Sequence, residues 1–160
     1  MTLNDLISRV VPTITAEAHC DIPCGIYDPT LAKIAAKTVA RMVDQLLDLE
    51  EPTDKASRIA YVNASARRVK VKEEHAEICK RELQILWSDF FKPENIGGFP
   101  NIHETFWKAL KLAGKNKVEI NKDAAKQLLV AVDEIAQNFY KAKNVPDRFK
   151  AYQEITDKLY

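Results

Sequence analysis

Helical spacing of apolar residues recurs along this chain, and β-strand signals are nearly absent. Residues 29–50, 54–91, 100–113 and 121–142 each place apolar side chains three or four positions apart, with proline or glycine between the segments. Amphipathic helices joined by short connections predict an all-α protein, an antiparallel four-helix bundle. A further helical segment is expected over residues 145–160.

The same spacing predicts which side chains face the core. In the first two helices they are Leu31, Ile34, Ala35, Thr38, Met42, Leu46, Leu49, Ile59, Val62, Ala66, Ala76, Cys79, Leu83, Leu86 and Phe90. In the next two they are Ile102, Phe106, Trp107, Leu110, Ala124, Leu128, Val132, Ile135 and Phe139. Asp28 and Asp54 are expected at helix N-termini, and Gly114 is expected to end the third helix.

Composition limits the classes of protein to which this chain can belong. Its 160 residues, 46% of them hydrophobic, suffice for one core. The balance of 24 basic and 23 acidic residues argues against nucleic acid or an anionic membrane as the main partner. No apolar run approaches the roughly 20 residues that cross a bilayer. The odd count of 3 cysteines fits reduced or metal-bound thiols, which predicts a cytoplasmic protein.

One short stretch combines the residue types that bind late transition metals. Residues 19–29 read His-Cys-Asp-Ile-Pro-Cys-Gly-Ile-Tyr-Asp-Pro, and we call this segment the hook. Thiolates beside an imidazole suit such a metal, and ligands this close in sequence can surround one ion. Pro23 stiffens the chain between the cysteines, and Gly25 permits a tight exit.

The residues before the hook indicate processing. Residues 16–18 are Ala-Glu-Ala, small residues of the kind that precede a protease cleavage site. No uninterrupted apolar region of about seven or more residues lies in residues 1–18, so this segment is interpreted as a pro-segment and not as a secretory signal. Cleavage would make His19 the mature N-terminus.

A free α-amine on His19 completes a set of metal donors. The amine, the deprotonated amide nitrogen of Cys20 and its thiolate could chelate one ion, and the Cys24 thiolate would complete a plane. The His19 imidazole is placed to supply an axial ligand. Planar nitrogen and sulfur donors favour Ni(II) or Cu(II) over tetrahedral zinc, and nickel, one ion per chain, is the preferred prediction.

The hook resembles the metal-binding hook of nickel-containing superoxide dismutases, including its place after a removable leader. Residues 86–93, Leu-Trp-Ser-Asp-Phe-Phe-Lys-Pro, resemble a tryptophan-centred segment of that family, and a looser likeness extends to about residue 143. The resemblance implies conversion of superoxide to oxygen and hydrogen peroxide, with nickel cycling between Ni(II) and Ni(III), in antioxidant defence. It also implies a maturation protease and a homohexamer.

The resemblance also assigns roles around the metal. His19, Cys20 and Cys24 would be the ligands. Tyr27 would line the access path and order solvent, while Asp21 and Pro23 would hold the shape of the hook. The expected organisation is a removable segment (1–18), the hook (19–29), a bundle (30–143) and a C-terminal helical extension (144–160).

Three positions depart from the family pattern. Family members often brace the axial imidazole with a glutamate and an arginine, where this chain has Ala35 and His75. His75 with Glu73 or Glu74 could replace that brace. The family's second tyrosine near the site corresponds to Phe90, so Tyr27 would act without a phenol partner.

The same residues admit other interpretations. The hook could be a chance cluster, or Cys20 and Cys24 could form a redox disulfide, although their spacing is not C-x-x-C. The chain could instead be a helical metal-handling protein that stores or passes on nickel. His75 and Cys79 lie one helical turn apart, but two ligands make an incomplete metal site, so core packing is favoured for Cys79.

Overall fold

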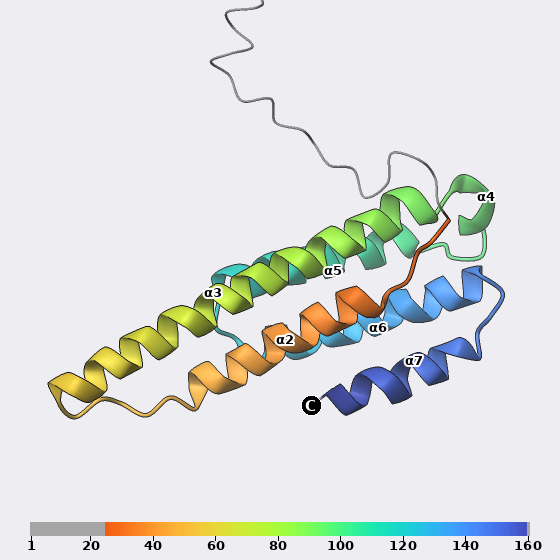
Figure 1. Cartoon of the computed structure of the whole chain (residues 1–160). Helices are drawn as coiled ribbons and strands as arrows, with labels where there is room; N and C mark the ends of the chain where they lie inside the picture. Colours follow the sequence, from red (N-terminus) through yellow and green to blue (C-terminus); the bar gives the residue numbers. More distant parts are fainter. Residues whose placement is uncertain (1–24, 160) are drawn as a thin grey trace, which may run out of the picture.

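The structure is a computed structural model that describes residues 25–159, and within this range it contains helices and turns but no strand (Figure 1). The α-helices are α2 (Thr30–Leu47), α3 (Lys55–Ile85), α4 (Pro93–Ile96), α5 (Ile102–Val118), α6 (Lys122–Ala142) and α7 (Arg148–Thr156). A π-helical turn, η1 (Leu86–Phe90), continues α3, and a 3-10 turn, η2 (Asp157–Leu159), follows α7.

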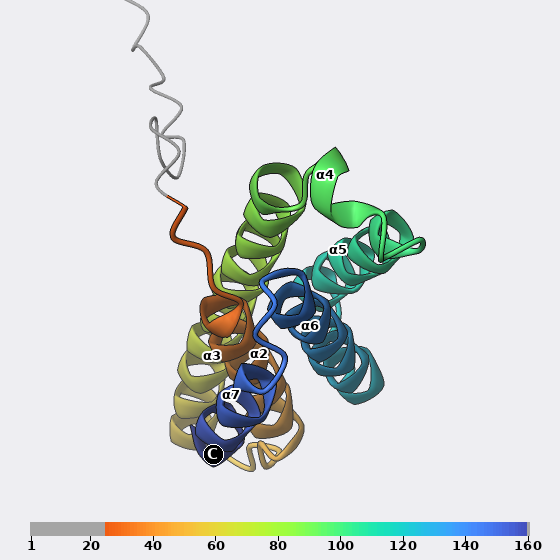
Figure 2. The same cartoon turned by 90° about the vertical axis from the view of Figure 1, so that its right-hand side faces the viewer.

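Four long helices form the bundle. Helix α2 packs against α3 and α6, and α5 packs against the same two helices, so each long helix has two main neighbours (Figure 2). The chain reverses direction between successive long helices (Figure 1). The predicted all-α four-helix bundle is therefore confirmed, while residues 19–24 of the hook lie outside the described residues.

The buried face of α2 differs from the predicted one. Leu31 and Ile34 are 49% and 39% exposed, so their expected place in the core was wrong. The buried apolar residues of this helix are small: Ala32, Ala35, Ala36, Val39, Ala40 and Val43. Small side chains let helix backbones approach closely, and packing against both α3 and α6 selects this face over the one with the larger residues.

The first turns of α3 are also more exposed than predicted. Ile59 and Val62 are 64% and 59% exposed, and Ala66 is exposed as well. Helix α3 has 31 residues whereas α2 has 18, and each residue adds about 1.5 Å to a helix. The N-terminal part of α3 therefore extends past its neighbours, and its apolar spacing does not meet a partner within residues 25–159 of this chain (Figure 1).

Helix α5 runs further than predicted. It continues through Gly114 to Val118, so Gly114 does not end it. A buried lysine supports its last turn: the Lys72 Nζ atom donates hydrogen bonds to the carbonyl oxygens of Asn116 and Lys117, at 2.5 and 3.0 Å. These bonds satisfy carbonyl groups that a helix C-terminus leaves without helical partners.

Helix α6 matches its prediction, because Ala124, Leu128, Val132, Ile135 and Phe139 are all buried. The C-terminal helix α7 packs on α2 and α6 of its own chain. The predicted cap Asp54 accepts hydrogen bonds from the backbone N–H groups of Ala56 and Ser57, at 2.7 and 2.9 Å, and so begins α3. None of the helices within residues 25–159 is long and apolar enough to cross a membrane.

Candidate metal centre

Tyr27 is the predicted site residue that the structure describes. The predicted ligands His19, Cys20 and Cys24, and the predicted support Asp21, lie outside the described residues. Their assignments therefore stay predictions. The structure describes the last residues of the hook, from residue 25 onward, and the helices that contact them.

The described part of the chain offers no alternative metal site built from the usual ligands. Within residues 25–159, no group of three or more histidine, cysteine, aspartate or glutamate side chains could hold a metal ion. The donor set that remains is the imidazole, thiolates and amine predicted for residues 19–24, and its chemistry suits nickel. The residue types predicted as ligands therefore fit a nickel ion.

Cys79, the cysteine outside the hook, is a core residue. Its side chain is fully buried, and burial raises the pKa of its thiol to about 12. A thiol with that pKa is protonated near neutral pH and is a poor metal ligand. The ring atom Nδ1 of His75, four residues earlier, lies 2.9 Å from the carbonyl oxygen of Val71 on the same helix. The packing role predicted for Cys79 is confirmed.

The exit of the hook has a defined backbone. Gly25 has a φ of 70°, in the left-handed region that glycine adopts without strain, which agrees with its predicted role at a tight exit. Asp28 lies two residues before the first residue of α2, and its Oδ1 atom accepts a hydrogen bond from the backbone N–H of Thr30 at 2.8 Å. The N-cap residue of α2 is Pro29, so the prediction of Asp28 as the cap and Pro29 as the first helical residue was wrong by one position.

A second contact fixes Asp28 from another helix. The hydroxyl of Tyr140, on α6, donates a hydrogen bond to Asp28 Oδ2 at 3.2 Å. Burial, followed by the negative charge of Asp28, raises the pKa of Tyr140 to about 12. The two residues are 112 positions apart, and no local motif around Tyr140 marks the contact. Sequence reasoning therefore missed it.

Tyr27 is half-buried, and its ring packs on the ring of Phe90 with centroids 5.8 Å apart. Phe90 in turn lies 4.5 Å from the ring of Phe139 in the core. Next to Tyr27 is a cavity of about 210 Å³, lined by residues of the hook exit and of the end of α3: Ile26, Tyr27, Asp28, Leu31, Glu82, Ile85 and Leu86. The structure thus confirms a phenylalanine, not a phenol, as the ring neighbour of Tyr27.

The tryptophan-centred segment, residues 86–93, contains Phe90, the ring neighbour of Tyr27, and is itself held by contacts of Trp87. Trp87 lies in the π-helical turn η1, donates a hydrogen bond from Nε1 to Nδ1 of His103 at 2.8 Å, and stacks on Phe106 with centroids 6.0 Å apart. A π-helical turn shifts the residues after it relative to a regular helix. Phe90 is the last residue of this turn, in the position from which it contacts Tyr27 and Phe139.

Ala35 and His75 occupy the positions at which family members carry the glutamate and arginine of the brace, and they do not form an equivalent brace. Ala35 is 1% exposed, inside the core. The proposed substitutes Glu73 and Glu74 are exposed, and Glu74 pairs with Lys70 at 3.7 Å on its own helix. His75 contacts the backbone of its own helix instead of either carboxylate. The described residues thus give no support to His75 with Glu73 or Glu74 as a replacement.

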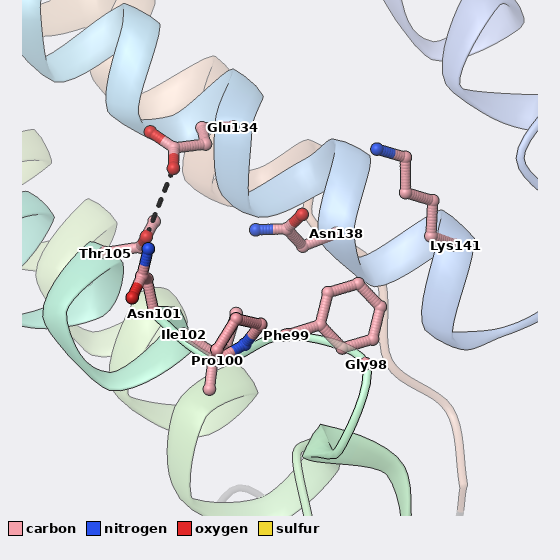
Figure 3. A pocket seen from close by; sticks show the side chains of 9 residues that line it. All are labelled: Gly98, Phe99, Pro100, Asn101, Ile102, Thr105, Glu134, Asn138 and Lys141. Atoms are coloured by element: carbon pink, nitrogen blue, oxygen red, sulfur yellow. Dashed lines mark hydrogen bonds between the residues drawn. The ribbon is translucent and has the colours of Figure 1, made fainter.

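A polar pocket of about 240 Å³ lies between the start of α5 and the end of α6 (Figure 3). Figure 3 shows Thr105 and Glu134 joined across it by a hydrogen bond of 3.1 Å, with Asn138 and Lys141 further along α6. Its lining includes neither cysteine nor histidine. Amide, carboxylate and ammonium groups do not form a soft-donor nickel site, so this pocket is separate from the candidate metal centre.

Comparison with known proteins gives consistent matches. The sequence model of one family, described as nickel-containing superoxide dismutase, matches residues 14–143. The superoxide dismutase [Ni] of Streptomyces coelicolor (strain ATCC BAA-471 / A3(2) / M145) is 30% identical over 139 residues, which are 86% of this chain and 98% of that protein. The corresponding protein of Streptomyces seoulensis is 29% identical over the same shares.

Solved structures agree with the sequence matches. The native structure of nickel superoxide dismutase superposes with a TM-score of 0.68 and 29% identity, covering 78% of this chain and 99% of that chain. A crystal structure with nickel ligation corresponding to the oxidised state gives a TM-score of 0.69 and 28% identity, with coverage of 79% and 99%. The resemblance derived from the hook is confirmed, and α7 lies outside the matched range 14–143.

Proposed function

Because the chain belongs to the nickel-containing superoxide dismutase family, we propose that its hook binds the nickel ion through His19, Cys20 and Cys24. As a member of this family it is an oxidoreductase that acts on superoxide with nickel as its cofactor. The proposal for the ligands rests on one observation above all: the soft donors of the chain are concentrated in residues 19–24, and no cluster of three ligands occurs in residues 25–159.

The reaction converts two superoxide ions and two protons into oxygen and hydrogen peroxide. When bound, the nickel ion would supply a one-electron couple between Ni(II) and Ni(III). The thiolates of Cys20 and Cys24 and the amidate of Cys20 would stabilise the higher oxidation state, because anionic donors favour the more positive ion. This explains why cysteine is used although peroxide can oxidise it. Removal of superoxide would serve antioxidant defence.

Tyr27 is proposed to control access to the metal. Its ring is held against Phe90, and it borders the cavity at the hook exit. A phenol held in this way can order solvent and limit which molecules approach, while superoxide remains small enough to pass. Asp21 and Pro23 are proposed to hold the shape of the hook, as polar and conformational supports of metal ligands do elsewhere.

Maturation is proposed to require removal of residues 1–18. A chain that keeps them has a peptide bond at the nitrogen of His19, so this nitrogen is not the free amine that the donor set needs. The Ala-Glu-Ala sequence of residues 16–18 supports cleavage at this point by a protease that accepts small residues.

Self-association is proposed as well, with a hexamer as the expected form. Exposed apolar side chains at the far end of the bundle support it, since Leu47, Ile59 and Val62 are 55%, 64% and 59% exposed. Exposed apolar groups gathered on one part of a surface favour contact with another protein. Light scattering of the purified protein would give the number of chains.

The test of the proposed function compares two forms of the chain. One form begins at His19 and the other keeps all 160 residues. After nickel loading, intact mass, nickel content and superoxide removal are measured on the same samples. We expect near-stoichiometric nickel and activity in the form that begins at His19, and neither in the full-length form. Nickel binding without superoxide removal in the shorter form would contradict the proposed mechanism.

A further inference from the structure

Helix α7 lies outside the family-matched range and is firmly attached to the bundle (Figures 1 and 2). Its Tyr152 is 4% exposed and its Thr156 is fully buried. The Lys37 Nζ atom, on α2, donates a hydrogen bond to the carbonyl oxygen of Thr156 at 2.6 Å. The Tyr152 hydroxyl donates to Asp133 Oδ1, on α6, at 3.2 Å. The extension is thus held by both α2 and α6.

The packing of α7 continues to the end of the hook through two tyrosine rings. The ring centroids of Tyr152 and Tyr140 are 5.9 Å apart, and Tyr140 is 6% exposed. The Tyr140 hydroxyl donates to Asp28, and the ring of Tyr152 lies beside the ring that carries this hydroxyl. A cavity of about 300 Å³ lies beside these contacts, and its lining includes Asp28, Tyr140, Tyr152 and Arg148.

Asp28 is the point at which the hook meets the bundle. One carboxylate oxygen accepts the N–H of Thr30 at the start of α2, and the other accepts the Tyr140 hydroxyl from α6. The carboxylate therefore joins two helices, one residue after Tyr27. Any rotation of the chain at Asp28 would change the direction in which Tyr27 and the residues before it leave the bundle.

We propose that α7 positions the metal hook, with Tyr140 as the positioning residue: the Tyr152 ring holds Tyr140, and the Tyr140 hydroxyl holds Asp28. This rests on the proposed function, since it assigns the direction of the hook to a contact outside the hook. Tyr140 itself touches neither substrate nor metal in this scheme. Its effect passes through Asp28 and Tyr27.

The experiment compares two variants that each lose a hydroxyl-to-carboxylate hydrogen bond of 3.2 Å. Tyr140→Phe removes the bond to Asp28, and Tyr152→Phe removes the bond to Asp133, while both keep their rings. In the full chain without nickel, hydrogen exchange at the Thr30 amide is measured by NMR. We expect exchange to be faster by roughly three- to tenfold in Tyr140→Phe, the effect of losing one hydrogen bond, and unchanged in Tyr152→Phe. Tyr152→Ala removes the α7 ring that packs on Tyr140 and should also speed Thr30 exchange, whereas no effect of Tyr152→Ala would overturn the role of α7.

A second readout uses the nickel-loaded form that begins at His19. Tyr140→Phe is expected to lose nickel to a chelator faster than the parent and to alter the electron paramagnetic resonance signal of the metal. Asp28→Asn keeps one oxygen, which can still accept the Thr30 N–H, but places an amide NH2 group where the Tyr140 hydroxyl donates. Asp28→Asn and Asp28→Ala should therefore both lose nickel faster than the parent, as Tyr140→Phe does.

The outcomes separate this inference from the proposed function. Equal effects of Tyr140→Phe and Tyr152→Phe on Thr30 exchange, or no effect of Tyr140→Phe, would overturn the positioning role. If the parent bound no nickel while the exchange result held, the anchoring of Asp28 would stand and the proposed ligand set would fail.

Discussion

The Nζ atom of Lys33 lies 2.7 and 2.6 Å from the two carboxylate oxygens of Asp133, although the residues are 100 positions apart in sequence. The lysine side chain is 4% exposed and the aspartate side chain 28%. The same carboxylate accepts the Tyr152 hydroxyl. The ion pair joins α2 to α6, and the Tyr152 hydrogen bond adds α7 to the same carboxylate.

Removing one partner of this pair should destabilise the protein. Lys33→Met keeps most of the side-chain volume but leaves Asp133 without its cation. Loss of one partner of a fully buried pair costs roughly 3–5 kcal/mol, and because water reaches Asp133 we expect about 2–3 kcal/mol here. Urea denaturation followed by circular dichroism, at fixed protein concentration, measures the change in free energy of unfolding.

The matched control for this variant is Lys70→Met. Lys70 pairs with Glu74 at 3.7 Å on the surface of α3, and both side chains are more than half exposed. Exposed pairs of this spacing contribute about 0.3–0.5 kcal/mol. Similar losses for Lys33→Met and Lys70→Met would mean that the pair with Asp133 does not join the helices as described.

The three cysteines should respond differently to substitution. Cys20→Ser and Cys24→Ser should each abolish nickel binding and superoxide removal together, because a serine hydroxyl is not a comparable anionic donor at neutral pH. Cys79→Ala should keep both, since Cys79 is buried in the core with a raised thiol pKa of about 12. Nickel content and activity are measured on forms that begin at His19. Full activity of either hook variant would contradict the proposed ligand set.

The fold was largely predictable from the chain, because helical spacing depends on local sequence. The apolar stripe of α6 matched at each of its predicted positions. The face of α2 was not predictable in the same way, since the choice between Leu31 with Ile34 and the alanines beside them depends on how closely the neighbouring helices approach. Large apolar residues on a helix indicate a buried face only where a partner lies opposite.

The chemistry of the metal site was predictable from the sequence, but the contacts that hold the end of the hook were not. The hook is a local motif, and residue type with spacing is enough to propose nickel. The contact of Tyr140 with Asp28 depends on the packing of α6 against the start of α2. The register of Phe90 depends on a π-helical turn that no residue of this segment specifies by itself. Supports of this kind arise from tertiary packing.

Substitution of Tyr27 should affect access more than metal content. Tyr27→Phe keeps the ring that packs on Phe90, so the wall at the hook exit should persist. The phenol oxygen is lost, and with it the solvent that it orders. We expect a changed KM or a changed sensitivity to small anionic inhibitors, with nickel content equal to that of the parent. Loss of nickel from this variant would show that Tyr27 holds the metal site together.

Stability at alkaline pH should depend on Tyr140. Burial and the charge of Asp28 raise the pKa of Tyr140 to about 12, whereas an unfolded tyrosine has a pKa of about 10. The folded state therefore holds this proton more tightly than the unfolded state. The associated stability is fully present below about pH 10 and is lost as the pH rises through about 12. A pKa shift of this size corresponds to at most roughly 2–3 kcal/mol of the free energy of unfolding.

The measurement is the free energy of unfolding by urea between pH 9 and pH 12, for the parent and for Tyr140→Phe. Lysine side chains also titrate in this range, and taking the difference between the two curves removes their contribution. We expect the parent to lose more stability than the variant as the pH rises, because phenylalanine has no proton to release. The pKa of Tyr152 is raised by burial, by Asp133 and, less strongly, by Tyr140, so the difference between the curves also contains the small part of the Tyr152 shift that Tyr140 causes. Parallel curves would show that the Tyr140 hydroxyl is not held in the folded protein.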